Sequence, residues 1–219
     1  SNLAGSKAIK SIDKNLVDRN EEFTITSTIG NTSQENLKNV KSLEILPVSG
    51  DTNGSLFTGN FTLKVLDLAD NQNLYYTTNS INNIGITQDK YGKNTIKEVN
   101  LANDSRWIKV TENETIPANA TAIASQIDIV APYANLSYKL QIIPKNNAQG
   151  NMYAFTMNVT SDNLAQAVKS NTVVATVTTR NIEGFAFIDN NRNNIYDNGD
   201  TLLKNNVVKL LNGNGTQIT

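Results

Sequence analysis

Three features of the 219-residue sequence predict an all-β sandwich. Apolar and polar residues alternate with a period of two in segments rich in β-branched residues, as expected for strands with one buried face. Clusters of Asn, Gly, Asp and Ser separate these segments and supply the turns that antiparallel strands need. No segment keeps a 3.6-residue apolar period long enough to predict a helical layer.

The predicted strands follow one another along most of the chain. Two segments with some helical character, 117–125 and 161–170, are too short to organise a layer and are expected to be turns between strands. The segments 50–55 and 67–73 are rich in Asp and Asn, and turns are favoured there over ion sites. The strands predicted from the alternation are 23–30, 61–68, 95–101, 125–131, 137–144, 152–159 and 171–180.

A domain boundary is predicted near Arg180 to Glu183, because one strand pattern ends there and a new apolar alternation begins with Phe185 and Phe187. Residues 1–6 are expected to be a cloning-derived or disordered extension, 7–181 a β-sandwich domain, and 182–219 the N-terminal part of a second β-module. About 37 residues are too few to close a sandwich, so the second module is expected to be truncated and its last strand, 206–212, to be an unprotected edge.

Composition excludes several classes of function. The chain has no cysteine and no histidine, which removes disulfides, thiolate zinc sites and the commonest general base. Its 19 basic and 20 acidic residues form no basic tract among aromatics, so we expect no nucleic acid partner. No apolar stretch is long enough to insert into a membrane. Oxygen ligands remain, which suit calcium, and we expect no enzyme activity.

The segment 189–200, DNNRNNIYDNGD, has the spacing of a calcium-binding loop. In such a loop, alternate side chains, one backbone carbonyl and a final carboxylate surround a single ion. Position 7 donates only its carbonyl, so its apolar side chain is expected to turn inward and anchor the loop. The predicted ligands are Asp189, Asn191, Asn193, Ile195, Asp197 and Asp200.

Two positions depart from the calcium-loop pattern. Asn194 stands where glycine is preferred for its positive φ, and Asp200 stands where a longer glutamate binds with both oxygens more easily. We therefore expect weak affinity, with a Kd of about 10⁻⁴ to 10⁻³ M. The alternative is an Asn- and Asp-rich hairpin loop that holds no ion.

These residues carry a resemblance to a known family. Residues 184–200, GFAFIDNNRNNIYDNGD, and 205–215, NNVVKLLNGNG, resemble the start of the B-type repeat domain of serine-aspartate repeat surface proteins of Gram-positive bacteria. The resemblance implies an immunoglobulin-like, calcium-binding module with the ligand positions given above. Asn194 replaces the family's loop glycine, and Val208 and Leu210 match its next strand. It implies a rod-like spacer in an extracellular, cell-wall-anchored protein.

Residues 7–181 resemble more loosely the repeat-type β-domains that precede such modules in secreted clostridial and bacillar surface proteins. The resemblance is carried by 44–63, by LYYTT at 74–78, by Trp107 and by 170–184. It implies an exported, immunoglobulin-like β-sandwich but assigns it no ligand. A ligand-binding adhesin domain is an equally good interpretation of this region.

Three functions remain open. The chain is a spacer joined to neighbouring immunoglobulin-like modules, an adhesin domain that binds a host extracellular-matrix protein or glycan, or an accessory β-module of a large secreted glycan-degrading enzyme. A covalent Lys–Asn isopeptide crosslink is also considered, in which Lys7, Lys10 or Lys14 joins Asn171 beside a buried acid. An aromatic platform for sugars or peptides is considered too, but core packing is favoured for its four residues, Tyr75, Tyr76, Trp107 and Tyr133.

Overall fold

The structure is a computed structural model that describes residues 4–178 and 183–218 and divides the chain into two compact units, 1–179 and 180–219. We describe each unit by itself. Most of the predicted junction, 180–182, lies outside the described residues. Within the described ranges the chain forms no α-helix, and its one helical turn is the 3₁₀ helix η1 (Ile81–Asn83). No helix in those ranges is long and apolar enough to cross a membrane.

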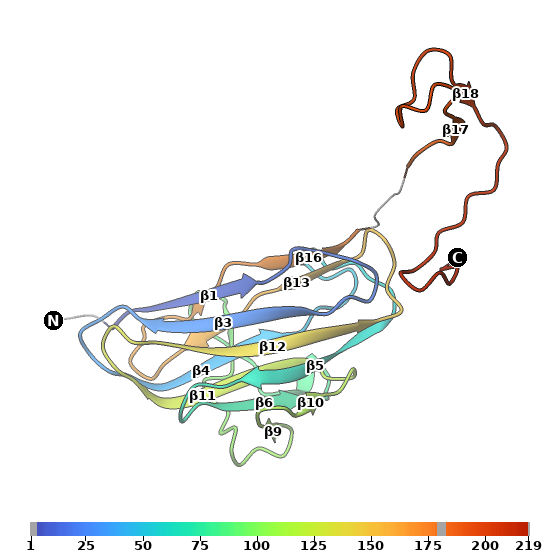
Figure 1. The fold of residues 1–219 in the computed structure, drawn as a ribbon. Coiled ribbons are helices and arrows are strands. Elements are labelled where there is room, and N and C mark those ends of the chain that lie inside the picture. Colours follow the sequence, from blue (N-terminus) through green and yellow to red (C-terminus); the bar gives the residue numbers. More distant parts are fainter. Residues whose placement is uncertain (1–3, 179–182, 219) are drawn as a thin grey trace. The chain divides into compact units, whose positions relative to one another are not determined.

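Unit 1 is a β-sandwich of two facing antiparallel sheets (Figure 1). The first sheet has the strand order β1 (Ser6–Ile12), β3 (Phe23–Asn31), β12 (Asn135–Lys145), β5 (Asn60–Asp67) and β10 (Thr115–Ile116). The second has the order β15 (Val168–Lys169), β14 (Asn158–Thr160), β4 (Leu37–Ile45), β11 (Ala122–Val130), β6 (Asn73–Thr77) and β9 (Ile108–Val110).

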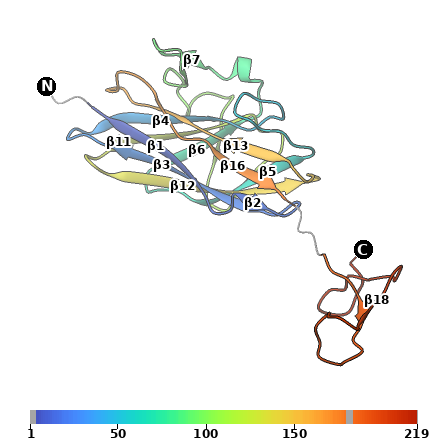
Figure 2. The ribbon, with the colours of Figure 1, turned by 90° about the horizontal axis from the view of Figure 1, so that it is seen from above.

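Two smaller sheets complete unit 1. A three-stranded sheet has the order β13 (Met152–Phe155), β16 (Val173–Val177) and β2 (Leu16–Val17), and its β16–β2 pair is parallel. A short hairpin joins β7 (Thr87–Gln88) to β8 (Asn94–Thr95). The parallel pair places the end of the unit's last strand beside a strand from its beginning (Figure 2).

Period-two alternation produces the core between the two large sheets. In β3, Phe23, Ile25 and Ile29 are buried and face the opposite sheet, while the intervening threonines are half-buried. One apolar cluster joins β3, β5 and β12 to β6 and β11 across the sandwich, and a second joins β1 and β3 to β4 and β11.

A third layer covers the outer face of the six-stranded sheet. The chain between β6 and β9 packs Ile84, Ile96, Val99 and Trp107 against outward-facing side chains of that sheet, such as Tyr75. Strand β4 is therefore buried on both faces. The alternation at 95–101 is produced by this packing, since only Asn94–Thr95 is strand and the backbone turns at Ile96, whose carbonyl accepts the Val99 N–H at 3.0 Å. The strand predicted at 95–101 is thus wrong beyond its first residue.

The other predicted strands are confirmed with one adjustment. The single strand expected at 152–159 is two strands, β13 and β14, which belong to different sheets. The turns expected at 117–125 and 161–170 are confirmed only in part, because residues 122–125 already belong to β11 and Val168–Lys169 form β15. Two long strands have no counterpart in the prediction, β1 and β4, because polar residues occupy inward-facing positions at their centres.

Unit 2 has far less regular structure. Its strands β17 (Phe187–Ile188) and β18 (Thr201–Leu202) pair as a hairpin, and an isolated bridge joins Leu211 to Gln217. The strand expected at 206–212 does not form. Only the end of this segment is paired, through the Leu211–Gln217 bridge, and residues 206–210 have no regular structure. Val207 and Val208 in that stretch are 85% and 83% exposed.

Candidate functional site

The candidate calcium loop connects the two short strands of unit 2. Phe187 pairs with Leu202 and Ile188 with Thr201, so 189–200 closes a hairpin. The Leu203 N–H extends the pairing by donating to the Ala186 carbonyl at 2.9 Å. The two ends of the loop are thereby fixed next to each other.

Four of the predicted ligand side chains converge within the loop. The Asp189 carboxylate accepts the N–H of Asn193 at 3.1 Å and of Asn194 at 2.7 Å. The Asp197 carboxylate accepts the side-chain amides of Asn191 at 2.9 Å and Asn193 at 2.5 Å. Asp189, Asn191, Asn193 and Asp197 are therefore linked by hydrogen bonds within the loop.

Asp200 closes the loop from its other end. One carboxylate oxygen accepts the Asn190 N–H at 2.9 Å and the other accepts the Asp197 N–H at 3.0 Å. Both oxygens of this short side chain are thus directed at the backbone. Each oxygen accepts one hydrogen bond and retains a second lone pair.

Asn194 adopts the conformation that the spacing requires. Its φ is 63°, in the left-handed region for which calcium loops prefer glycine, and asparagine tolerates that region better than most residues.

The predicted ligands are of the chemical type that binds a hard cation, but the side-chain amides among them are not oriented to bind one. Carboxylate and amide oxygens are the ligands calcium prefers. In the described residues, no group of three or more acidic side chains is arranged to hold a metal. The amide N–H₂ groups of Asn191 and Asn193 point at Asp197, so rotation of both amides is needed to present their oxygens instead.

The expectation that Ile195 anchors the loop is wrong. Its side chain is 65% exposed, because unit 2 forms no core at that point. Its neighbour Tyr196 provides the contact instead, with ring centroids 4.9 Å from Phe185 and 5.3 Å from Phe187. The aromatic residue between loop positions 7 and 9 therefore ties the loop to the segment that precedes it.

Of the three lysines considered for a covalent crosslink, Lys7 and Lys14 are exposed and Lys10 lies in the core of unit 1. Lys10 Nζ lies 2.6 Å from Glu44 Oε2 and donates to Ser27 Oγ at 2.7 Å, and both charged side chains are buried. Asn171 contacts the backbone of Lys10 instead of its amine: its Oδ1 accepts the Lys10 N–H at 2.8 Å and its Nδ2 donates to the Lys10 carbonyl at 2.9 Å. Burial lowers the pKa of Lys10, and Glu44 partly opposes that shift.

This ion pair belongs to a buried polar belt that sequence patterns alone did not reveal. The belt crosses the sandwich between the two apolar clusters. The Tyr138 hydroxyl donates to Glu44 at 3.4 Å, and burial raises the pKa of Tyr138, so it remains protonated. Its members are Lys10, Ser27 and Tyr138 from the five-stranded sheet and Ser42, Glu44 and Ser125 from the six-stranded sheet. The detectable signal is a polar residue at an inward position of β1, β3, β4, β11 and β12, between apolar residues of the two clusters.

The four aromatic residues considered for a binding platform do not share a surface. Tyr75 and Trp107 are buried in the third layer, where Trp107 Nε1 donates to the Ile84 carbonyl at 3.1 Å. Tyr76 is half-buried against the inner core, and Tyr133 is exposed in a turn. The core interpretation is confirmed for Tyr75 and Trp107.

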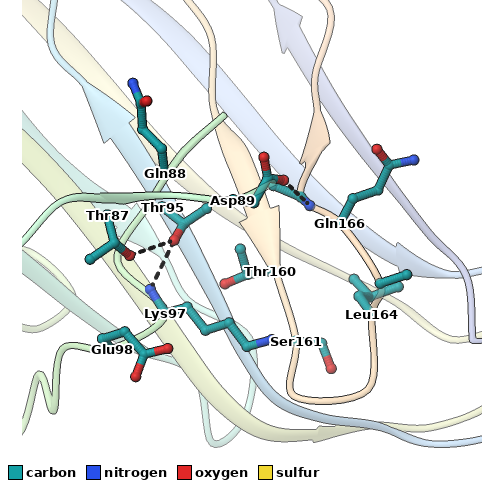
Figure 3. Close-up of a pocket in the computed structure, with 12 residues that line it drawn as sticks. Thr87, Gln88, Asp89, Thr95, Lys97, Glu98, Thr160, Ser161, Leu164 and Gln166 are labelled. Atoms are coloured by element: carbon teal, nitrogen blue, oxygen red, sulfur yellow. Dashed lines mark hydrogen bonds between the residues drawn. The ribbon is translucent and has the colours of Figure 1, made fainter. Parts of the chain in front are cut away.

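A polar cavity of about 190 Å³ lies where the β7–β8 hairpin meets the turn at 160–167 (Figure 3). The Asp89 carboxylate accepts the N–H of Ala167 at 2.9 Å, and Lys93 Nζ donates to the Ala167 carbonyl at 2.9 Å. The Lys97 side chain runs along the cavity toward Ser161 (Figure 3). Because Asp89 and Lys93 already have partners, these contacts explain how the hairpin is fixed to the sandwich.

No protein-family model and no curated protein matches the sequence. Among solved structures, the major pilin SpaD from Corynebacterium diphtheriae aligns with 78% of this chain and 34% of its own, at 13% identity and a TM-score of 0.36. A type I cohesin from Pseudobacteroides cellulosolvens aligns with 83% of this chain and 97% of its own, at 9% identity and 0.36.

A collagen-binding domain from a Staphylococcus aureus adhesin aligns with 78% of this chain and 97% of its own, at 11% identity and a TM-score of 0.32. The chain spans about a third of the pilin and nearly all of the cohesin and the collagen-binding domain. At these identities and TM-scores, the similarities carry no argument about function.

Proposed function

We propose that the chain is a non-enzymatic segment of a Gram-positive surface protein, in which a β-sandwich adhesin or spacer domain is followed by a calcium-ordered loop. The observation that supports this proposal is the loop at 189–200. Its side chains occur at calcium-loop spacing, and a hydrogen-bonded hairpin brings them together. The resemblance of the same residues to B-type repeats supplies the extracellular, wall-anchored setting.

In the proposed site, a bound calcium ion supplies positive charge that offsets three carboxylates. Asp189, Asp197 and Asp200 bind the ion with carboxylate oxygens, Asn191 and Asn193 turn their amide oxygens inward, and Ile195 contributes its carbonyl. Tyr196 holds the loop against Phe185 and Phe187. Because the unfolded loop does not preform such a site, binding stabilises the ordered loop.

Limited proteolysis tests the proposal. We expect cleavage within 189–200 to slow when calcium rises to about 10 mM, roughly ten times the weak limit of extracellular calcium modules. An Asp189→Asn/Asp197→Asn variant serves as the control, because it keeps the size of both side chains and removes two charges. Equal cleavage rates in calcium and in EDTA would exclude the calcium-ordered loop.

The binding partner of unit 1 needs a separate experiment. An array of host extracellular-matrix proteins and glycans, probed with the full chain, distinguishes an adhesin from a spacer. Selective binding to one class of array member supports the adhesin, and no binding to any member supports the spacer. Sequence next to this segment in the gene tests the accessory-module alternative, which predicts a hydrolase domain there.

A further inference from the structure

The first and last strands of unit 1 are tied together along the line between the unit's two ends. The beginning of β1 and the end of β16 lie at opposite ends of the sandwich in both views (Figures 1 and 2). Tension applied through the chain therefore pulls these strands in opposite directions along their own axes. When two strands slide past each other, all the hydrogen bonds between them are loaded at once. When the strands are peeled apart from one end, their hydrogen bonds break one at a time.

The parallel pair of β2 and β16 forms the first tie. Thr176 pairs with Leu16 and Val177 with Val17. The Thr176 N–H donates to the Asn15 carbonyl at 2.9 Å, and the Thr178 N–H donates to the Val17 carbonyl at 2.8 Å. Because the pair is parallel, pulling from the two ends of unit 1 shears it instead of peeling it.

Asn171 forms the second tie, in the middle of β1. One edge of β1 pairs with β3, where Lys10 lies opposite Ser27. On the other edge, the Asn171 amide occupies both backbone groups of Lys10, as an adjacent strand would. Asn171 lies two residues before β16, so it joins the final segment of unit 1 directly to its first strand.

The buried pair of Lys10 and Glu44 forms the third tie. Lys10 extends from β1 into the core and meets Glu44 of β4, which belongs to the opposite sheet. Sliding β1 along its axis separates these charges inside the sandwich. Separation of a buried pair is strongly unfavourable, because each charge is left without solvent and without a partner.

We propose that unit 1 is a mechanical clamp that carries tension by shear between its end strands, locked at a junction of Lys10, Glu44 and Asn171. The inference goes beyond the calcium loop and uses only unit 1. It rests on the proposed surface location for the origin of the tension but not for the geometry that resists it. The structure assigns the lock to side chains of three separate segments that meet at the centre of β1.

Single-molecule stretching of the full chain between its ends tests the clamp. Unit 1 is recognised by a length increase of about 60 nm, the extended length of roughly 175 residues. Asn171→Ala removes both side-chain bonds to Lys10. We expect this variant to unfold about tenfold faster at a given force, since forced unfolding follows the unfolding rate.

Asn163 supplies a matched control whose side chain is bonded to the start of β4 and not to β1. Its side chain also makes two bonds to backbone, accepting the Lys38 N–H at 3.1 Å and donating to the Asn36 carbonyl at 2.8 Å. Asn163→Ala should change the forced-unfolding rate by no more than about twofold. Equal acceleration by the two variants, or no acceleration by Asn171→Ala, would overturn the lock.

A change of pulling direction tests the shear geometry in otherwise unaltered protein. The chain has no cysteine, so cysteines placed at Gln34 and Pro132 provide unique attachment points. These positions follow β3 and precede β12, which are adjacent antiparallel strands, so pulling there peels the sheet. We expect unfolding at lower force than from the ends. Equal forces in the two directions would refute the clamp, and neither result depends on calcium.

Discussion

Units 1 and 2 share the same alternating sequence pattern and differ in what the alternation buries. In unit 1 the apolar positions of facing sheets meet and form continuous clusters. In unit 2 no residue of 183–218 is buried, and Val207, Val208 and Ile195 are largely exposed. Alternation predicts which faces of a strand are apolar, but only a paired backbone and an opposing sheet make that face a core.

The two units also differ in what their polar residues do. In unit 1 the charges of Lys10 and Glu44 are buried against each other. In unit 2 the carboxylates of Asp189, Asp197 and Asp200 are bonded by backbone and amide groups of their own loop. The first unit has a packed core and the second has local hydrogen bonds around exposed carboxylates, so we expect the second to respond more strongly to ions.

The largest effect should come from breaking the buried ion pair in unit 1. Glu44→Leu leaves the Lys10 ammonium buried without its partner, and we expect a loss of about 3–5 kcal/mol of folding free energy. Lys10→Met/Glu44→Leu should recover most of that loss, because an apolar pair of similar volume replaces the ions. Urea unfolding measures both. A double variant as unstable as the single one would show that the charges are not compensating each other.

The same substitution in the two units gives the next largest difference. Val65→Ala removes methyl groups from a fully buried position and should cost about 2–3 kcal/mol, including the cavity left behind. Val208→Ala removes the same atoms from a side chain that is 83% exposed, and the expected change is within about 0.5 kcal/mol. Comparable losses would mean that unit 2 has a core that the structure does not show.

Acid should weaken unit 1 by protonating Asp89, whose carboxylate accepts the backbone N–H groups of Ala167 and Lys93. The Ala167 N–H, and then that of Lys93, hold the pKa of Asp89 below its ordinary 3.8. A carboxyl whose folded pKa is depressed stabilises the fold above its unfolded pKa, and that contribution is lost as pH falls through the folded value. Asp89→Asn should therefore reduce the fall in melting temperature below about pH 4. The same dependence of melting temperature on pH in the variant and the wild type would show that these hydrogen bonds to Asp89 do not contribute to stability.

The covalent crosslink considered from the sequence gives the smallest expected effect. Lys10 Nζ is bonded to Ser27 and Glu44, and the Asn171 amide is bonded to backbone. We therefore expect the intact mass of the protein to equal the sum of its residues. Loss of one ammonia in wild type, absent from Asn171→Ala, would show that the two side chains react and that the core rearranges to allow it.

The all-β class and most strands were predictable because alternation is a local property of the sequence. Strands β1 and β4 were not, since Lys10, Ser42 and Glu44 interrupt their apolar faces and only the fold shows that these residues meet. The 95–101 pattern was misleading for the opposite reason, because Ile96 and Val99 pack on the outside of a sheet without forming a strand.

The candidate loop was predictable in position and in the backbone of Asn194, because both follow from local spacing. The role of Ile195 was not, because an inward side chain requires a core to enter and unit 2 has none at that point. Tyr196 performs the anchoring through contacts with Phe185 and Phe187, which no single-residue pattern indicates.

Amide hydrogen exchange on the full chain, with and without calcium, compares the two units in one measurement. We predict that amides of β3, β11 and β12 exchange slowly under both conditions, because their strands lie in the packed sandwich. Amides of 189–200 should exchange rapidly in EDTA and become protected in calcium. Identical exchange of the loop in calcium and in EDTA would contradict a calcium-ordered second unit.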